Sequence, residues 1–166
     1  DVDGLDALLL LLPTDGRPGA RLPDASRWQA LQDQGKPGHG TLRATTVGAA
    51  GHCVAAVAWC RTDASAFEVL ELAGKLVKQA LGLRPHARRI AVMVPDGSGA
   101  RRRQWQEALC AAACAQAFAL PTAKRPSPDE PAPARLEQVL VIQPERSLDL
   151  RRCQVTADAG NLVRHL

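Results

Sequence analysis

Residues 5–12 have the sequence LDALLLLL, an apolar run that is interrupted only by Asp6 and stops at Pro13. Three further runs of similar length are bounded in the same way by proline, glycine or charged residues, at positions 52–59, 90–94 and 139–142. Nearly continuous apolar runs of this length are typical of strands that are covered on both faces. These four runs therefore predict interior strands of one sheet.

A fifth run, at residues 41–47, alternates between apolar and polar positions and has threonine at three of them. β-Branched residues in an alternating pattern favour a strand with one solvated face. We expect this strand at the edge of the sheet, joined to the strand at 52–59 by a turn over residues 48–51.

The clearest helical pattern covers residues 66–81. Ser65 and Glu68 have the spacing of a capping box, and Gly82 lies where a left-handed residue would end the helix. Charged side chains at positions 68, 71, 75 and 78 recur on one stripe and indicate the solvent face. The remaining apolar residues would then face the sheet: Phe67, Leu70, Ala73, Val77, Ala80 and Leu81.

Two other segments have helical patterns. Residues 101–119 are almost wholly apolar after Glu107, which predicts a helix buried on more than one side. Residues 22–32 predict a shorter helix that is capped by Asp24 or Ser26 and points Trp28 and Leu31 inward. Strands that alternate with helices in this order predict an α/β fold with crossover connections. The length of 166 residues fits one such domain.

Composition narrows the class of protein further. Hydrophobic residues make up 46% of the chain and charged residues 23%, which excludes a disordered or fibrous chain. The longest apolar run is far shorter than the roughly 20 residues that a membrane span needs. Residues 121–135 hold five prolines and predict an exposed connection. Five cysteines without paired spacing favour free thiols in a reducing cytoplasm.

The residues that carry catalytic and metal chemistry form no recognisable set. The four histidines are scattered, and no CxxC or HExxH motif occurs. Cys110 and Cys114 share an apolar helical face, where burial raises the pKa of a thiol and the residue acts as part of the core. Residues 35–40, GKPGHG, have a proline inside them and predict a turn rather than a phosphate-binding loop. We therefore assign no catalytic residue and no metal ligand.

Basic residues concentrate in one segment. Residues 84–103 contain six arginines and a single acidic residue, so this segment could attract a polyanion. The turn at 95–99 would place backbone N–H groups between the carboxyl end of a strand and the start of a helix. The candidate anion or nucleic-acid contacts are Ser98, Gly99, Arg101, Arg102 and Arg103. The alternative is an ordinary N-cap followed by a solvated helical face.

The last segment of the chain, from Ser147 onward, has apolar residues at helical intervals: Leu148, Val155, Ala159, Leu162 and Leu166. This stripe runs to the final residue without the glycine, proline or polar residue that closes most helices. We expect a helix that continues into a following domain outside this chain.

The order of these elements resembles the N-terminal domain of the leucyl (cytosol) aminopeptidases along the whole chain. The most specific match is residues 159–166, AGNLVRHL, which are similar to the helix that joins the two domains of that family. After the strand at 52–58 the family usually has Gly-Leu-Gly, whereas this chain has Trp59 and Cys60. That difference concerns a local loop and not the fold.

The resemblance implies an α/β fold of a particular kind. We expect a macro-domain-like three-layer sandwich over residues 1–144, in which a mixed, mostly parallel sheet is flanked by helices. Residues 145–166 would begin an interdomain helix that leads to a catalytic domain absent from this chain. In that family two divalent metal ions, zinc or manganese, and the catalytic residues belong to the catalytic domain. The resemblance therefore implies no cofactor and no catalytic residue here.

The function implied by the resemblance is that of an accessory domain. It would serve assembly and active-site access in a cytoplasmic, hexameric metallo-exopeptidase that releases N-terminal amino acids from peptides. The expected partners are the catalytic domain and other copies of the enzyme, with peptide bound only by the complete protein and no contact with membranes. Two alternatives are open: a DNA-binding regulatory module that uses residues 84–103, and a macro-like binder of ADP-ribose at residues 96–101.

Overall fold

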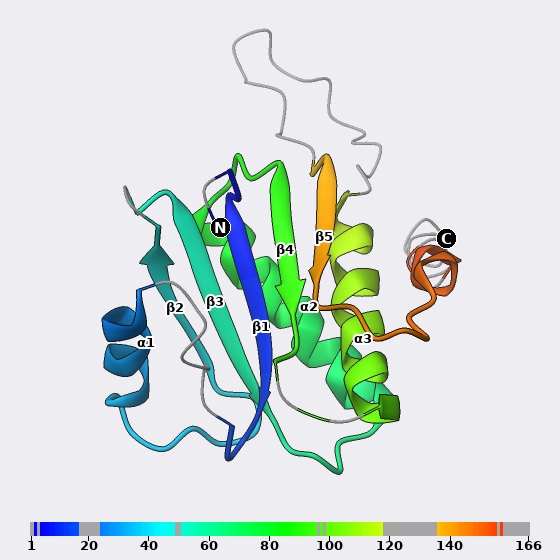
Figure 1. Ribbon diagram of the computed structural model, residues 1–166, viewed down its shortest axis with the longest axis horizontal. Coiled ribbons are helices and arrows are strands. Elements are labelled where there is room, and N and C mark those ends of the chain that lie inside the picture. The colour runs from blue at the N-terminus through cyan, green and yellow to red at the C-terminus, as the bar shows by residue number, and fades with distance from the viewer. Residues whose placement is uncertain are drawn as a thin grey trace, which may run out of the picture.

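The computed structural model describes residues 2, 4–16, 24–48, 51–95, 97, 99–117, 136–155 and 157. Five strands form one sheet in the order β2-β3-β1-β4-β5 (Figure 1). Their bounds are β1 (Ala7–Pro13), β2 (Leu42–Val47), β3 (Cys53–Cys60), β4 (Arg89–Met93) and β5 (Gln138–Ile142). β2 is antiparallel to β3, and the other neighbouring strands are parallel. The predicted mixed, mostly parallel sheet is confirmed.

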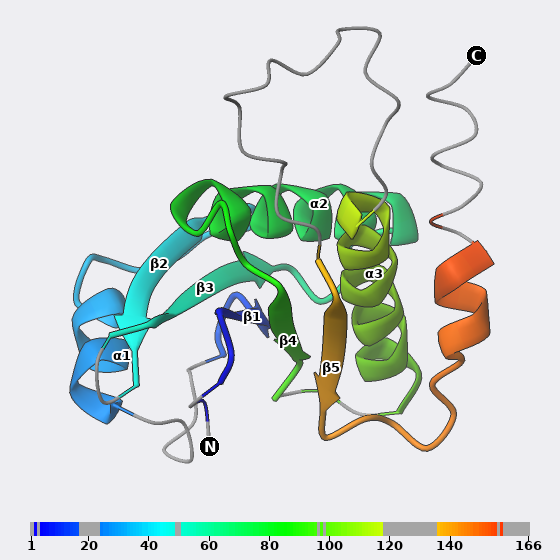
Figure 2. The same ribbon diagram turned by 90° about the horizontal axis from the view of Figure 1, so that it is seen from above.

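Helices cover both faces of this sheet (Figure 2). α1 (Ala25–Gln32) packs on one face through Trp28 and Leu31. α2 (Ala66–Leu83) and α3 (Gly99–Ala117) pack on the opposite face and against each other. The three layers confirm the predicted α/β sandwich.

β1 lies at the centre of the sheet, between β3 and β4. Its side chains alternate between the two layers: Leu9 and Leu11 belong to the apolar cluster with α2 and α3, and Leu8, Leu10 and Leu12 to the cluster with α1. All seven residues of the strand are buried. The continuous apolar run in the sequence follows from this burial on both faces.

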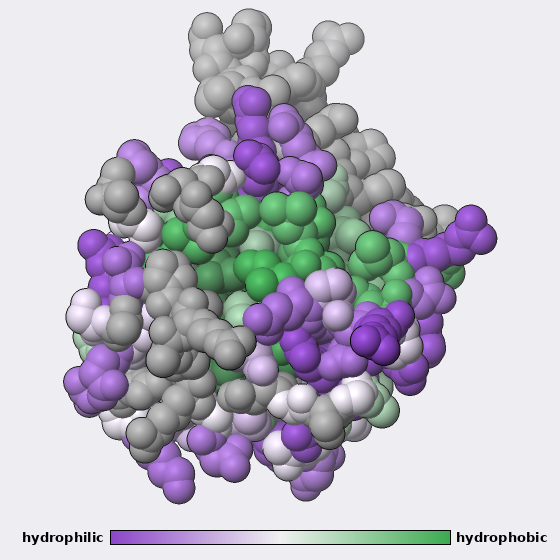
Figure 3. Space-filling model, viewed as in Figure 1, coloured by the Kyte–Doolittle hydropathy of each residue, from purple (hydrophilic) through white to green (hydrophobic). Residues whose placement is uncertain are grey.

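β5 is the one strand whose place in the sheet differs from the expectation. It pairs only with β4 and its apolar side chains are half-buried, so the prediction of an interior strand is wrong. Leu140 and Ile142 pack against the α1-side cluster, but α1 itself lies at the β2 end of that face, away from β4 and β5 (Figure 1). Hydrophobic residues therefore reach the surface in front of β4 and β5 (Figure 3). The expected edge position of β2, antiparallel to β3, is confirmed.

α2 has the predicted capping box. The Ser65 hydroxyl accepts from the Glu68 N–H at 3.3 Å, and the Glu68 carboxylate accepts from the Ser65 N–H at 2.8 Å. The helix continues through Gly82 to Leu83, so the prediction that Gly82 is a left-handed end is wrong. Pro85 is the second residue after the end of the helix, and it cannot extend the helix.

The buried face of α2 differs in part from the predicted one. Phe67 is 75% exposed, so its predicted contact with the sheet is wrong. It lies two residues before the buried Val69 and therefore about 200° around the helix from it. The residues that α2 does bury are Val69, Leu72, Ala73, Leu76, Val77 and Ala80.

The other two predicted helices are present with shifted ends. α1 begins at Ala25, and its predicted inward residues, Trp28 and Leu31, are buried. Asp24 is the N-cap residue, but its carboxylate accepts from the Gly48 N–H at 2.7 Å rather than capping the helix. α3 begins at Gly99, two residues earlier than predicted, and is buried on several sides; residues 118 and 119 lie outside the described part.

Residues 150–155 after β5 are helical, as predicted for this part of the chain. They pack through Cys153, with Ala157 just beyond them also buried. Val155 is 62% exposed, so its predicted place on the buried stripe is wrong, because the segment packs through smaller side chains. Leu148 of that stripe is half-buried, whereas Ala159, Leu162 and Leu166 and the proline-rich segment 121–135 lie outside the described residues. In the part of the chain that is described, no helix is long and apolar enough to cross a lipid bilayer.

Asp6 joins three strands immediately before β1 begins. Its carboxylate accepts from the backbone N–H groups of Arg88 and Arg89 at 2.8 and 2.9 Å, and its backbone pairs with Val54 and Arg89. Burial by itself raises the pKa of Asp6, but these two hydrogen bonds and the charges of Arg84 and Arg89 outweigh it, so the pKa is lowered. Asp6 thus stabilises the fold in its ionised form.

We expect the Asp6→Asn substitution to lower the free energy of unfolding by about 1 kcal/mol at pH 7. Because the pKa of Asp6 is lower in the folded state than in the unfolded chain, its contribution is present above the unfolded pKa, near 4. It is lost as the pH falls through the folded value. The difference between wild type and D6N should therefore shrink at pH 3, as measured by urea denaturation at both pH values. An equal difference at pH 7 and pH 3 would contradict this role.

Candidate functional site

The predicted anion site begins at the N-terminus of α3. Gly99 is the first residue of this helix, and Arg101, Arg102 and Arg103 lie in its first turns. Ser98 lies outside the described residues. The Arg101 guanidinium lies 6.0 Å from the centre of the Trp105 ring.

The other two arginines of this cluster have acidic partners. Arg102 pairs with Glu145 at 3.3 Å and donates to the Gln143 carbonyl at 2.8 Å, while Arg103 pairs with Glu107 at 3.8 Å. The structure therefore gives each guanidinium its own intramolecular contact and does not gather the three around one point. Anion binding here stays a prediction.

Gln106 forms a junction between α3 and the chain after β5 that the sequence did not indicate. Its side chain is fully buried. Its amide nitrogen donates to the Gln143 carbonyl at 3.0 Å, and its amide oxygen accepts from the Glu145 N–H at 2.9 Å. Both polar ends of this buried amide need a hydrogen-bond partner, and they find them at residues 143 and 145. The amide therefore fixes the turn at Gln143, whose φ is 52°.

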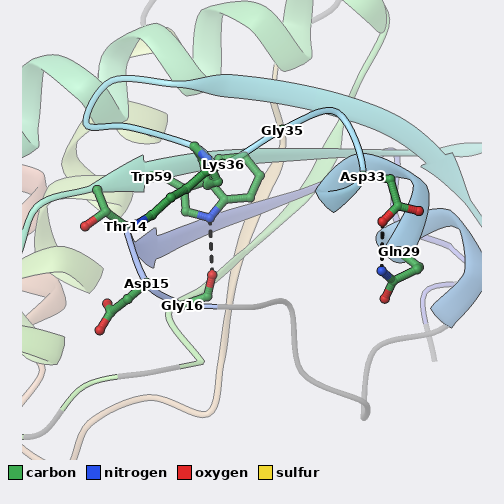
Figure 4. Close-up of a pocket in the computed structure, with 9 residues that line it drawn as sticks. Thr14, Asp15, Gly16, Gln29, Asp33, Gly35, Lys36 and Trp59 are labelled. Carbon is green, nitrogen blue, oxygen red and sulfur yellow. Dashed lines mark hydrogen bonds between the residues drawn. The ribbon is translucent and has the colours of Figure 1, made fainter.

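A pocket of about 430 Å³ opens at the carboxyl edge of the sheet (Figure 4). Its volume is in the range of small-molecule sites, about 300–1,000 Å³. Three segments that are distant in the sequence contribute to it. The lining residues are Thr14, Asp15, Gly16, Gln29, Asp33, Gly35, Lys36, Pro37 and Trp59.

The position of this pocket follows from the topology. β1 is followed by α1 on one face of the sheet, whereas its neighbour β3 is followed by α2 on the other face. Connections that leave neighbouring parallel strands in opposite directions open a crevice outside the carboxyl ends of those strands. Residues 14–16 follow β1 and Trp59 lies at the end of β3, so the pocket occupies this crevice.

Arg43 of β2 and Trp59 of β3 support the pocket. The Trp59 indole N–H donates to the Gly16 carbonyl at 3.3 Å. The Arg43 guanidinium lies 5.3 Å from the centre of the Trp59 ring. The same guanidinium also donates hydrogen bonds to three carbonyls, those of Leu31, of Gln34 (3.2 Å) and of Gly35 (2.8 Å). One side chain therefore holds the end of α1 and the following loop against the sheet.

The pocket carries charges of both signs. Asp33 accepts from the Gln29 amide at 3.0 Å. Within the described residues, neither Asp15 nor Lys36 forms an ion pair. The described lining residues include no histidine, cysteine or serine, and the described part of the chain has no group of three or more side chains that could hold a metal. The charges of Asp15, Asp33 and Lys36 suit the binding of a polar molecule.

Comparisons with known proteins place the fold. The sequence matches no protein-family model and no curated protein. Among solved structures, the chain is similar to the bottromycin maturation enzyme BotP, at 22% identity and a TM-score of 0.63, over 98% of this chain and 32% of BotP. A structure of BotP in complex with Mn matches with 18% identity and a TM-score of 0.57, over 94% of this chain and 29% of that one.

A leucine aminopeptidase has the same fold. A mutant of the tomato enzyme matches with 16% identity and a TM-score of 0.59, over 95% of this chain and 34% of the enzyme. The chain thus spans about a third of the length of the structures that it matches. At these identities the likeness is one of fold, and it confirms the resemblance stated from the sequence at that level.

We expect the Arg43→Ala substitution to lower the free energy of unfolding by about 2 kcal/mol, since it removes hydrogen bonds to three carbonyls and the contact with Trp59. The matched control is Arg43→Lys, which keeps the charge but cannot bond the three carbonyls with one planar group, and its loss should be smaller. Urea denaturation measures both. Equal stabilities of R43A and wild type would show that Arg43 does not support the pocket.

Proposed function

We propose that this chain is the non-catalytic N-terminal domain of a leucyl-aminopeptidase-type enzyme, where it serves assembly and access to the active site. The observation that carries the proposal is the uneven coverage of the matches: 98% of this chain corresponds to 32% of BotP, and 95% of it to 34% of the tomato enzyme. A domain that accounts for about a third of such a chain leaves room for a separate catalytic domain.

The chemistry in this proposal belongs to the other domain. Two divalent metal ions, zinc or manganese, would be held there, where they polarise the scissile carbonyl and activate water. One of the matched BotP structures contains Mn, which supports a metal-dependent parent enzyme. The pocket of this chain has the residues of a binding site, which supports a role other than hydrolysis.

The path of the chain after β5 supports a connection to a second domain. Arg102 and Gln106 of α3 fix the turn at residues 143–145, and residues 150–155 then form a helix beside α3. In this proposal residues 145–166 begin the connection to the catalytic domain. The complete enzyme would be a cytoplasmic hexamer that removes N-terminal residues from peptides.

The first test is enzymatic. The purified 166-residue chain should not hydrolyse a leucyl anilide above the blank rate, with or without added Mn²⁺ or Zn²⁺, because the catalytic domain is missing. The longer protein of which this chain is a part should hydrolyse the same substrate and lose activity when a chelator removes its metal. Hydrolysis by the short chain would contradict the proposal, and so would a metal-loaded longer protein without peptidase activity.

The second test concerns assembly. Light scattering should give a hexamer for the longer protein. Removal of residues 1–144 should change the number of subunits in the assembly. If the truncated protein remains a hexamer of unchanged activity, the domain serves neither assembly nor access.

A further inference from the structure

Cys110 and Cys153 meet across two elements that are distant in the sequence. Cys110 lies in the middle of α3, and Cys153 lies in the helical segment 150–155 that follows β5. Each residue is only 2% exposed, and both belong to the cluster on the α2 and α3 side of the sheet. The Cys110 thiol donates a hydrogen bond to the sulfur of Cys153, and the Cys153 thiol lies 3.2 Å from the Asp149 carbonyl to which it donates.

The contacts of α3 hold the two sulfur atoms in place. Arg102, Gln106 and Cys110 are spaced four residues apart and so lie on roughly one face of the helix. Arg102 and Gln106 bind residues 143 and 145, and Cys110 binds Cys153 further along the same segment. The segment is therefore fixed at the turn after β5 and runs beside α3 (Figure 2). This arrangement brings the two thiols together before any bond forms between them.

The two thiols differ in reactivity. The hydrogen bond from Cys110 lowers the pKa of Cys153, although burial and the charges of Glu107 and Asp149 act in the opposite direction. The same hydrogen bond, together with burial, raises the pKa of Cys110. Because the thiolate is the attacking form and only Cys153 lines the adjacent cavity, Cys153 is the residue of the pair that reacts first.

A small opening reaches only one of the two residues. A cavity of about 150 Å³ between α2, α3 and the segment 150–155 is lined in part by Cys153, and Cys110 is not part of its wall. Apolar side chains form most of the wall, and Gln104, Glu107 and Arg152 add polar groups to it. This cavity offers a small oxidant a path to the Cys153 sulfur.

Two other cysteines provide a contrast within the same chain. Cys53 and Cys60 are buried on β3, and burial raises the pKa of each to about 11. Their thiols contact the carbonyls of the next residues, Val54 and Arg61. No disulfide is present at any of the five cysteines, all of which lie in the described part of the chain.

We propose that Cys110 and Cys153 form a reversible disulfide, with a peroxide or a small disulfide as the oxidant. With a peroxide, the Cys153 thiolate attacks one oxygen atom and the O–O bond breaks, which leaves a sulfenic acid; the departing hydroxide takes up the proton that Cys153 released on ionising and becomes water. The Cys110 sulfur then attacks the Cys153 sulfur, the S–S bond forms, and the hydroxyl leaves with the Cys110 proton as a second water. Two thiols lose two electrons, and one hydrogen peroxide gains them and becomes two waters.

A small disulfide accepts the same two electrons through thiol–disulfide exchange. Cys153 forms a mixed disulfide and releases one small thiol, and Cys110 displaces the second. The product joins the segment 150–155 to α3 covalently. If the proposed function holds, this bond restrains the connection to the catalytic domain, but the disulfide itself is a property of this chain and is tested without reference to peptidase activity.

The reduced chain is the starting point of the experiment. After removal of reductant it is treated with hydrogen peroxide or glutathione disulfide. We expect a loss of two hydrogens by intact mass and a Cys110–Cys153 link in the peptide map. The midpoint of thermal unfolding should rise by roughly 5–10 °C, because the bond constrains the unfolded chain. Dithiothreitol should reverse both changes. A chain that stays fully reduced, or a link that joins other cysteines or two molecules, would overturn the proposal.

Single substitutions separate the roles of the two residues. Cys110→Ser should trap glutathione on Cys153 as a stable mixed disulfide, whereas Cys153→Ser should leave Cys110 unmodified. The matched control is Cys60→Ser, a buried cysteine on β3 whose loss should leave the Cys110–Cys153 link intact; Cys114→Ser serves the same purpose on α3. Equal modification of Cys110 and Cys153 in the two variants would refute the order of reaction.

Discussion

The burial of β1 on both faces is the constraint on which the rest of this structure depends. Its five consecutive leucines are at most 1% exposed, and each contributes roughly 1.5–3 kcal/mol by leaving water. A strand of this kind needs cover above and below it, and α1 on one side and α2 and α3 on the other supply that cover. The features described at its two ends depend on that position: Asp6 at the start ties three strands together, and residues 14–16 after its end form a wall of the pocket.

The sequence predicted the strands well because a strand that is covered on both faces must be apolar along its whole length. It did not distinguish the edge strand β5 from the interior strands, because β5 has the same continuous apolar run although its side chains are only half-buried. Which face of a helix is buried is also hard to predict from composition: Phe67 and Val155 are large and apolar yet exposed, whereas Ala73 in α2 and Cys153 in the last segment are small and buried. Size alone does not decide which side faces the core.

The candidate site was less predictable than the fold. The pocket has walls from three segments, and none of its residues forms a motif by itself, so only the topology brings Asp15, Lys36 and Trp59 together. The arginines of α3 were visible in the sequence, but the partners of Arg102 lie about forty residues away, at Gln143 and Glu145. Such pairing weakens the inference from a run of basic residues to anion binding, because a guanidinium that is engaged within the fold is less available to a phosphate. Long-range partners are what local patterns cannot supply.

α3 contacts both the sheet and the chain that follows β5. One of its faces covers the sheet, and the line of Arg102, Gln106 and Cys110 holds the chain that follows β5. A fully buried amide is stable only when both its ends are satisfied, so Gln106 specifies one path for that chain and excludes others. The path then determines which residue Cys110 meets. A polar junction that fixes the turn after the last strand is therefore also what brings two thiols into contact, and the direction in which the chain leaves this fold is set by α3 and not by the sheet.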